Sequence, residues 1–326
     1  MRDCAVFLAL SSLATISAFA HNLNLTATYP DISQCALEPS IYSCENTTAI
    51  KNTCCSPTPG GLVLHTQFWS TYTGLEEQGQ RLPKGSWTIH GLWPDNCDGS
   101  FEQYCDMSRQ FDPEPSPAKF PNGTTIPPYE GPGVDTFVKA FGRDDLLEIM
   151  EKYWINQGAP NNVLWAHEFS KHATCTSTFD IACYGDAYEE NMELVNYFDA
   201  VMRSFHHYPT FDILAAYVVD LLVCMLGFLR LLSSAGIVPS NSTGYNLTSI
   251  QNALKSQTGA LPYLGCKNQT ILSEVWYFSH VYGTEQYGSY KNLDSTSPTS
   301  CAANQTIWYY ERTPAAEVEV RKSHWW

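Results

Sequence analysis

Two short segments of the sequence concentrate side chains that can exchange protons near neutral pH. The first, residues 87–95, reads WTIHGLWPD and contains His90 directly before Gly91, whose small size permits close approach of a ligand. The second, residues 165–175, reads WAHEFSKHATC. Imidazoles titrate near pH 6.5, so histidines can serve as both the acid and the base of one reaction. We therefore take these segments as the candidate catalytic site.

The second segment places four ionisable residues on one face of a predicted helix over residues 163–174. His167 and Lys171 are four positions apart, and so are Glu168 and His172, which brings all four together. Burying such a group is costly unless its members serve a function. Each histidine taken singly could equally be a hydrogen-bonded structural residue, but the group as a whole favours proton transfer.

A zinc protease is a different interpretation of the same segment. Zinc proteases carry HExxH, whose histidines lie four residues apart. Here the spacing is HExxxH, and a continuous helix rotates the second imidazole about 140° from the first. Lys171 would also place a positive charge beside a dication. We therefore expect no metal and no other cofactor.

The two segments together resemble the active-site segments of the ribonuclease T2 family, HGLWP and HEWxKHGTC. This sequence has HGLWP at residues 90–94 and HEFSKHATC at residues 167–175. Phe169 replaces a tryptophan and Ala173 a glycine, and neither change removes an ionisable group. The resemblance extends over roughly residues 30–313 and indicates a fungal secreted member.

The resemblance implies a secreted endoribonuclease that cleaves single-stranded RNA without a metal. His172 would remove the proton of the ribose 2′-OH, and His90 would protonate the departing 5′-oxygen. His167 would hold the phosphate, while Glu168 and Lys171 would stabilise the pentacoordinate phosphorane. The products would be a 2′,3′-cyclic phosphate and then a 3′-phosphate. Because the nucleophile belongs to ribose, DNA is not an expected substrate.

The resemblance also implies two base-binding sites. They comprise Trp93, Asp95 and Phe101 for the first base and Gln67, Asn156 and Gln157 for the second. Phe101 stands where a tyrosine is common and can still stack on a base. Trp93 and Phe101 could instead pack in the core. Because stacking tolerates every base, we expect low base specificity.

The N-terminus predicts export. Residues 4–20 are apolar and uncharged and end in Ala-Phe-Ala, a pattern typical of a signal peptide that spans residues 1–20 and is cleaved after Ala20. A membrane anchor is the alternative, but the run is short for a span. We therefore expect a protein secreted from the cell or delivered to a vacuolar compartment, without stable membrane insertion.

Cysteines and glycosylation sequons agree with export. Of twelve cysteines, Cys4 belongs to the signal and Cys224 to an unusual segment, which leaves an even set of ten. Spacing alone leaves their connectivity open, but the resemblance implies Cys35–Cys55, Cys44–Cys97, Cys54–Cys183, Cys105–Cys175 and Cys266–Cys301. N-glycosylation sequons begin at Asn24, Asn46, Asn122, Asn241, Asn246, Asn268 and Asn304.

Composition and periodicity predict one domain, and the resemblance implies that it is a catalytic domain over residues 21–326 with a tail at residues 314–326. We expect a monomer. The chain of 326 residues has 18 basic and 33 acidic side chains, a net charge of −15, which excludes a protein that coats nucleic acid by bulk positive charge. The predicted strands are 61–69, 86–93, 275–282 and 306–311, the helices are 143–155, 163–174 and 186–206, and residues 95–133 form a long loop. This pattern indicates an α+β fold, and the resemblance specifies a central antiparallel sheet flanked by helices and stapled by disulfides.

Residues 217–234, YVVDLLVCMLGFLRLLSS, are far more apolar than their surroundings. Asp220 and Arg230 interrupt the run, so a membrane span is not expected. Removing the segment would join residues 211–216 to residues 235–239, which reads as a helix end with glycine at C′. The genetic code permits codons for Ala216, Tyr217, Val218 and Ser234 that would supply the two ends of a 54-nucleotide intron, so we interpret the segment as a retained intron. A genuine amphipathic insertion is the alternative.

Two alternatives to a working ribonuclease stay open at this point. The chain could be a secreted binding or signalling protein on the same fold, which the loss of an active-site histidine would favour, although none is lost. It could also be the inactive product of a gene with an unspliced intron.

Overall fold

The computed structural model describes residues 35, 40–45, 49–216 and 236–320, and the structural statements below concern these residues. Its centre is an antiparallel sheet with strand order β3-β1-β6-β5, and β7 pairs with the far end of β6. The sheet strands are β1 (Leu62–Phe68), β3 (Thr88–Asp95), β5 (Tyr263–Lys267), β6 (Ile271–Tyr282) and β7 (Ser289–Leu293). Strand β1 lies between β3 and β6 and is buried along almost its whole length, its polar residues His65, Thr66 and Gln67 included.

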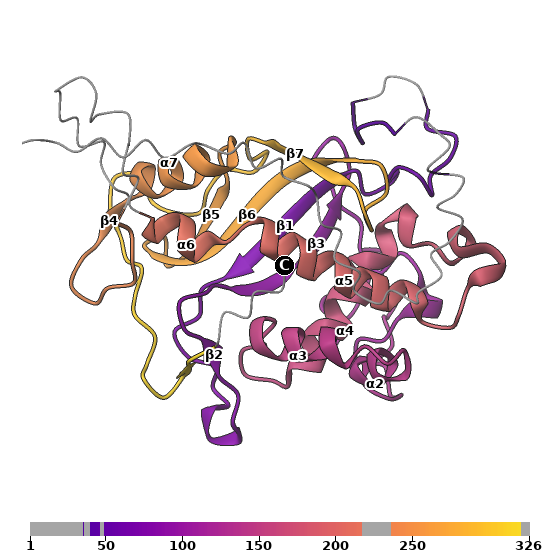
Figure 1. The fold of residues 1–326 in the computed structure, drawn as a ribbon, viewed down its shortest axis with the longest axis horizontal. Coiled ribbons are helices and arrows are strands. Elements are labelled where there is room, and N and C mark those ends of the chain that lie inside the picture. Colours follow the sequence, from indigo (N-terminus) through magenta and orange to yellow (C-terminus); the bar gives the residue numbers. More distant parts are fainter. Residues whose placement is uncertain (1–34, 36–39, 46–48, 217–235, 321–326) are drawn as a thin grey trace, which may run out of the picture.

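Helices pack on this sheet in two groups. The helices are α2 (Val134–Ala140), α3 (Asp144–Tyr153), α4 (Asn161–Lys171), α5 (Met192–His207), α6 (Thr210–Ala215) and α7 (Leu247–Thr258). Helix α5 crosses β1 and β3, with α3, α4 and α2 beyond it, while α6 and α7 lie beside β5 and β6 (Figure 1). Each group encloses its own apolar core, one built around Trp154, Trp165 and Phe198 and the other around Trp69, Trp87 and Tyr309.

Short elements complete the structure. Two small sheets pair β2 (Leu82–Pro83) with β9 (Glu317–Val318) and β4 (Tyr245–Asn246) with β8 (Thr306–Ile307). The 3-10 helices are η1 (Glu76–Gln78), η2 (Met107–Arg109), η3 (Ala173–Cys175), η4 (Ser177–Phe179) and η5 (Ile181–Ala187). No described helix is long and apolar enough to cross a membrane.

The α+β prediction with a central antiparallel sheet is confirmed, and the element boundaries differ in four places. Strand β3 continues through Pro94, which we expected to end it; β3 pairs only with β1, and an edge strand tolerates proline. The predicted helix over 186–206 is η5 followed by α5, and the predicted strand over 306–311 is only the two residues of β8. Helix α4 ends at Lys171 rather than at residue 174. Helices α2 and α7 and strands β5 and β7 had no counterpart among the predicted elements.

Five disulfides staple the fold, and they join the same pairs that the resemblance implied. The bonds are Cys35–Cys55, Cys44–Cys97, Cys54–Cys183, Cys105–Cys175 and Cys266–Cys301. The fourth ties the segment after α4 to the long loop over residues 95–133. The five sequon asparagines that are described, Asn122, Asn241, Asn246, Asn268 and Asn304, are all exposed. Asn24, Asn46, the signal segment 1–20 and residues 217–234 lie outside the described residues.

Candidate active site

The structure brings the two sequence segments together where β3 meets the C-terminal end of α4. Trp93 Nε1 donates a hydrogen bond to Glu168 Oε2 at 2.8 Å, and Glu168 Oε1 lies 3.6 Å from His90 Nε2. The indole of Trp93 stacks on His172, with ring centroids 4.9 Å apart, and the ring centroids of His167 and His172 are 6.3 Å apart. Lys171, the last residue of α4, interacts electrostatically with Glu168 and His172. All five predicted catalytic residues therefore belong to one constellation.

A β-bulge aims His90 at this constellation. In the register of β1 and β3, Gly91 faces Thr66 and Ile89 faces Gln67, so His90 is the extra residue of the bulge. Bulges redirect side chains and are common beside active sites. The carbonyl of His90 also accepts a hydrogen bond from Trp154 Nε1 at 2.8 Å, which anchors the bulge against the core.

Gly91 makes room for a protein carboxylate rather than for a ligand. A Cβ atom built at Gly91 would lie 1.8 Å from Glu168 Oε2. The side chain of Glu168 is fully buried, and only a residue without a Cβ allows β3 to pass so close to it. Our expectation that Gly91 admits a ligand is therefore corrected.

Burial shifts the pKa values of the site in opposite directions. Desolvation lowers the pKa of His172 well below its usual range, and the neighbouring Lys171, His167 and His90 act in the same direction. Desolvation also raises the pKa of Glu168, although the surrounding cations oppose this, and it lowers the pKa of Lys171. The site therefore favours a neutral His172 and a protonated Glu168.

Two further carboxylates, which the sequence reasoning missed, contact the other histidines. Asp112 Oδ2 lies 2.7 Å from His167 Nδ1 and accepts a hydrogen bond from Tyr104 at 2.8 Å. Glu274 Oε1 lies 2.9 Å from His90 Nδ1. An acidic residue at the start of the apolar run EVWYFSHVY was a signal for Glu274, whereas Asp112 in its proline-rich loop gave none.

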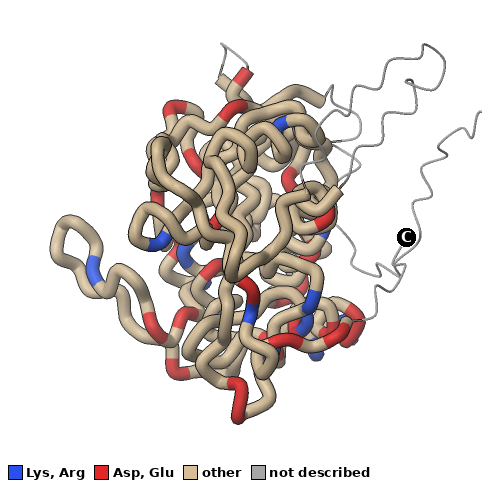
Figure 2. Tube along the Cα trace, turned by 90° about the vertical axis from the view of Figure 1, so that its left-hand side faces the viewer, with Lys and Arg blue, Asp and Glu red and all other residues tan. Residues whose placement is uncertain are grey.

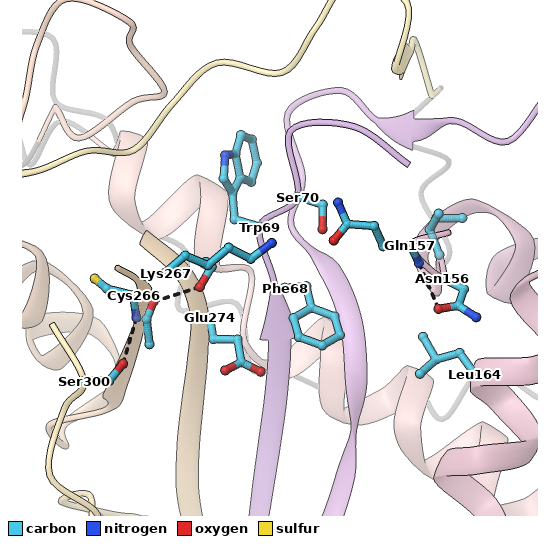
Figure 3. A pocket seen from close by; sticks show the side chains of 13 residues that line it. Phe68, Trp69, Ser70, Asn156, Gln157, Leu164, Cys266, Lys267, Glu274 and Ser300 are labelled. Atoms are coloured by element: carbon cyan, nitrogen blue, oxygen red, sulfur yellow. Dashed lines mark hydrogen bonds between the residues drawn. The ribbon is translucent and has the colours of Figure 1, made fainter. Parts of the chain in front are cut away.

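A cleft of about 500 Å³ opens beside His90. Its lining includes Phe68, Asn156, Gln157 and Glu274, which Figure 3 shows on both sides of the cleft. The ring of Phe68 stacks on His90 with centroids 3.7 Å apart. The cleft therefore lies next to His90, which contacts both Phe68 and Glu274 of its lining.

Gln67 does not reach this cleft, contrary to the expected second base site. Successive side chains of a strand point to opposite faces, and Phe68 occupies the cleft side of β1. Gln67 is buried on the other side, where its amide donates to the carbonyl of Tyr208 and accepts from the hydroxyl of Thr210. Both ends of the amide are thus occupied by the protein.

Asp95 and Phe101, expected around the first base together with Trp93, lie near it at the end of β3. Asp95 and Phe101 form an antiparallel bridge, and Phe101 is 65% exposed, so it is not a core residue. Trp93 is partly buried, and its contacts with Glu168 and His172 show that it also supports the catalytic groups. Burial raises the pKa of Asp95 to about 7.

His167, Glu168 and His172 each offer a possible metal-ligand atom, and these atoms lie within 4.8 Å of one another. Our spacing argument assumed a helix continuing through residue 174, which is wrong because α4 ends at Lys171 and His172 is its C-cap. The second argument still applies, since the ammonium of Lys171 belongs to the same turn and repels a dication.

Comparisons with known proteins agree with this fold and site. The sequence model of the Ribonuclease T2 family matches residues 60–220 and 222–303. The chain is 33% identical to Ribonuclease T2 of Aspergillus oryzae over 81% of this chain and 79% of that protein. It is 38% identical to Ribonuclease Trv of Hypocrea rufa over 76% of this chain and 86% of that protein. The chain therefore belongs to the ribonuclease T2 family.

Solved structures show the same relationship. The crystal structure of Actibind, a T2 ribonuclease, is similar to this chain with a TM-score of 0.65 and 30% identity, covering 84% of this chain and 96% of that one. The chain spans 63% and 54% of two longer fungal relatives.

Proposed function

We propose that the protein is a secreted endoribonuclease that cleaves single-stranded RNA by attack of the ribose 2′-OH on the adjacent phosphate. The observation that carries this proposal is the unequal environment of two histidines in one site. His172 has a lowered pKa and no carboxylate partner among the described residues, whereas His90 has the carboxylate of Glu274 at its Nδ1. A reaction with one base and one acid needs such a difference.

His172 is the base in this mechanism. With its pKa lowered, the ring is neutral at mildly acid pH and can accept the 2′-OH proton. Stacking on Trp93 holds the ring in place during this step. The attacking oxygen then forms a bond to phosphorus, which gives a pentacoordinate phosphorane.

His90 is the acid that protonates the departing 5′-oxygen. The carboxylate of Glu274 at Nδ1 complements the positive charge that this imidazole carries before it donates its proton. Breaking the bond from phosphorus to the 5′-oxygen leaves a 2′,3′-cyclic phosphate. Water then opens this product to a 3′-phosphate by the reverse use of the same two histidines.

Glu168 and Lys171 stabilise the charge that builds up on the phosphorane. Glu168 Oε2 is taken by Trp93, whereas Oε1 is buried and has no hydrogen-bond partner among the described residues. Because burial raises its pKa, a protonated Glu168 can donate from Oε1 to a phosphoryl oxygen. The ammonium of Lys171 counters the same charge, and Asp112 orients His167 to hold the phosphate.

The two base sites lie on opposite sides of this phosphate. The cleft beside His90 takes the base that follows the scissile bond, with Asn156 and Gln157 in its lining. Trp93, Asp95 and Phe101 take the base that precedes it. Exposed aromatic rings stack on any base, which supports low base specificity.

RNA is the substrate in this proposal, DNA is not, and the enzyme works as a monomer without a cofactor. Acidic positions are spread over the face seen in Figure 2, with Lys and Arg lying singly among them, so bulk charge does not attract RNA. Binding then depends on the local cations of the site. The pattern at residues 1–20, the disulfides and the exposed sequons support secretion.

Activity is expected to follow a bell-shaped pH profile with its maximum below pH 7. The rate rises as His172 loses its proton, and because its pKa is lowered, this limb lies at acid pH. The rate falls at higher pH once Glu168, whose pKa is raised by burial, loses its proton, and repulsion between RNA and the net charge of −15 grows over the same range. Initial rates on homopolymeric RNA from pH 3 to 9 test this. A steady increase from pH 5 to 9 would contradict the assignment.

A further inference from the structure

We propose that Glu274 is a positioning residue that fixes the tautomer and orientation of His90 for protonation of the leaving oxygen. This inference rests on the proposed role of His90 as the general acid. A carboxylate only accepts hydrogen bonds, so the 2.9 Å contact requires Nδ1 of His90 to carry a hydrogen. The proton to be donated is then on Nε2, the nitrogen that faces Glu168.

The surrounding rings leave His90 one orientation. Phe68 stacks on one face of the imidazole with an interplanar angle of 21°, and the edge of the ring meets Trp93 at a centroid distance of 4.6 Å. In the sheet register, Phe68 of β1 pairs with Thr88 of β3 on one side and with Glu274 of β6 on the other. Phe68 therefore lies between the strand that carries His90 and the strand that carries Glu274. Glu274 provides the hydrogen-bond acceptor for Nδ1 of the imidazole that these rings hold in place.

The neighbouring strand is shaped to admit Glu274. Gly265 of β5 faces Glu274, and a Cβ atom there would lie 2.8 Å from Glu274 Cβ and 3.1 Å from Oε2. The register of β5 and β6 shifts directly after Gly265. Any larger residue at this position would press the carboxylate out of place.

Glu274 acts through His90 rather than by holding RNA. The charged groups near it are His90, Glu168 on the far side of His90, and Lys267, which lines the same cleft. A carboxylate in the cleft repels phosphate, so direct substrate binding would be unfavourable. The side chains of His90 and Glu274 are 18% and 21% exposed, which shelters their contact from solvent.

The test compares two substrates whose leaving groups differ in their need for a proton. In a dinucleoside monophosphate the leaving group is the 5′-alkoxide of the second nucleoside, which needs a proton from the acid. In a nucleoside 3′-(4-nitrophenyl phosphate) the leaving group is 4-nitrophenolate, which is stable without one. Glu274→Leu is expected to lower kcat about 10- to 100-fold on the first substrate and to change it less than about 3-fold on the second. Glu274→Gln, which can still accept from Nδ1, should recover part of the loss.

Matched variants make each outcome decisive. Glu45→Gln removes a carboxylate 3.0 Å from the imidazole of His280 outside the site and should leave both substrates unaffected. His90→Phe should show the same selective loss as Glu274→Leu, and the double variant should be no slower than His90→Phe. An equal loss on both substrates, or no loss on either, would overturn the role of Glu274. Normal cleavage of the dinucleoside monophosphate by His90→Phe would instead overturn the proposed function.

Discussion

Replacing His172 by phenylalanine is expected to lower kcat on RNA by about 10²- to 10⁴-fold, the usual contribution of a positioned base. Phenylalanine preserves the stacking on Trp93, which lies parallel to the imidazole within 17°, and removes only the nitrogen that accepts the 2′-OH proton. The same loss is expected for His90→Phe. Steady-state kinetics on a dinucleoside monophosphate measure both variants.

The pH profile distinguishes the two roles. His172→Phe should flatten the acid limb of the residual activity, because it removes the group whose pKa is lowered, whereas His90→Phe should keep that limb. His280→Phe is the control, since this β6 histidine contacts Glu45 outside the site and should leave both limbs unchanged. Turnover like that of the unmodified enzyme in either active-site variant would remove that residue from its role.

Removing residues 217–234 is expected to give an active enzyme that is secreted in several-fold higher amount. We propose that this segment is not part of the working protein, as its apolar composition suggests. The described residues on either side are already joined, because Ile237 N–H donates to the carbonyl of Leu214 at 2.9 Å. Leu214 and Ile237 are both buried in the same apolar core, and Gly236 has φ of +49°.

The hydrogen bond between Leu214 and Ile237 is the kind that closes the C-terminal end of a helix once residues 217–234 are removed from the chain. Without residues 217–234, Ile237 follows Leu214 by five positions, so their hydrogen bond becomes the 6→1 bond of a Schellman motif with Gly236 at C′. The deletion also removes Cys224, a thiol left over from the five disulfides, and an apolar run that promotes aggregation.

Secreted yield, melting temperature and kcat of the full and deleted chains measure the effect of this deletion. We expect an equal or higher melting temperature and an unchanged kcat in the deleted chain. A control that replaces the segment with a Gly/Ser linker of equal length separates its chemistry from its length. Loss of secretion or activity on deletion would contradict the proposal, and so would a mature transcript that encodes residues 217–234 in the active secreted protein.

The parts of the site that the sequence could predict are those encoded locally. His90, His167, Glu168, Lys171 and His172 lie in two short motifs, and the structure places them in one constellation. What the motifs could not predict depends on pairing between distant strands and loops. Asp112 reaches His167 from 55 positions away, and Glu274 reaches His90 across 184.

Pairing between distant strands also explains why our expectations about Gln67 in the second base site and about the end of β3 were wrong. Gln67 and Phe68 are neighbours, and which of them faces the cleft follows from the strand's pairing in the sheet rather than from residue type. Pro94 could remain in β3 only because that strand lies at the sheet's edge. The bulge at His90 likewise becomes visible only in the register of β1 and β3.

The most direct test of the mechanism compares two dinucleoside monophosphates that differ only in the 2′-OH at the scissile linkage. The protein is treated with EDTA, and products are identified at mildly acid pH by ³¹P NMR and chromatography. We expect the ribose substrate to give a 2′,3′-cyclic phosphate and then a 3′-phosphate, and the 2′-deoxy substrate to stay intact. Cleavage of the deoxy linkage, a 5′-phosphate product, or loss of activity with EDTA that Mg²⁺ or Zn²⁺ restores would contradict a metal-independent attack by the ribose 2′-OH.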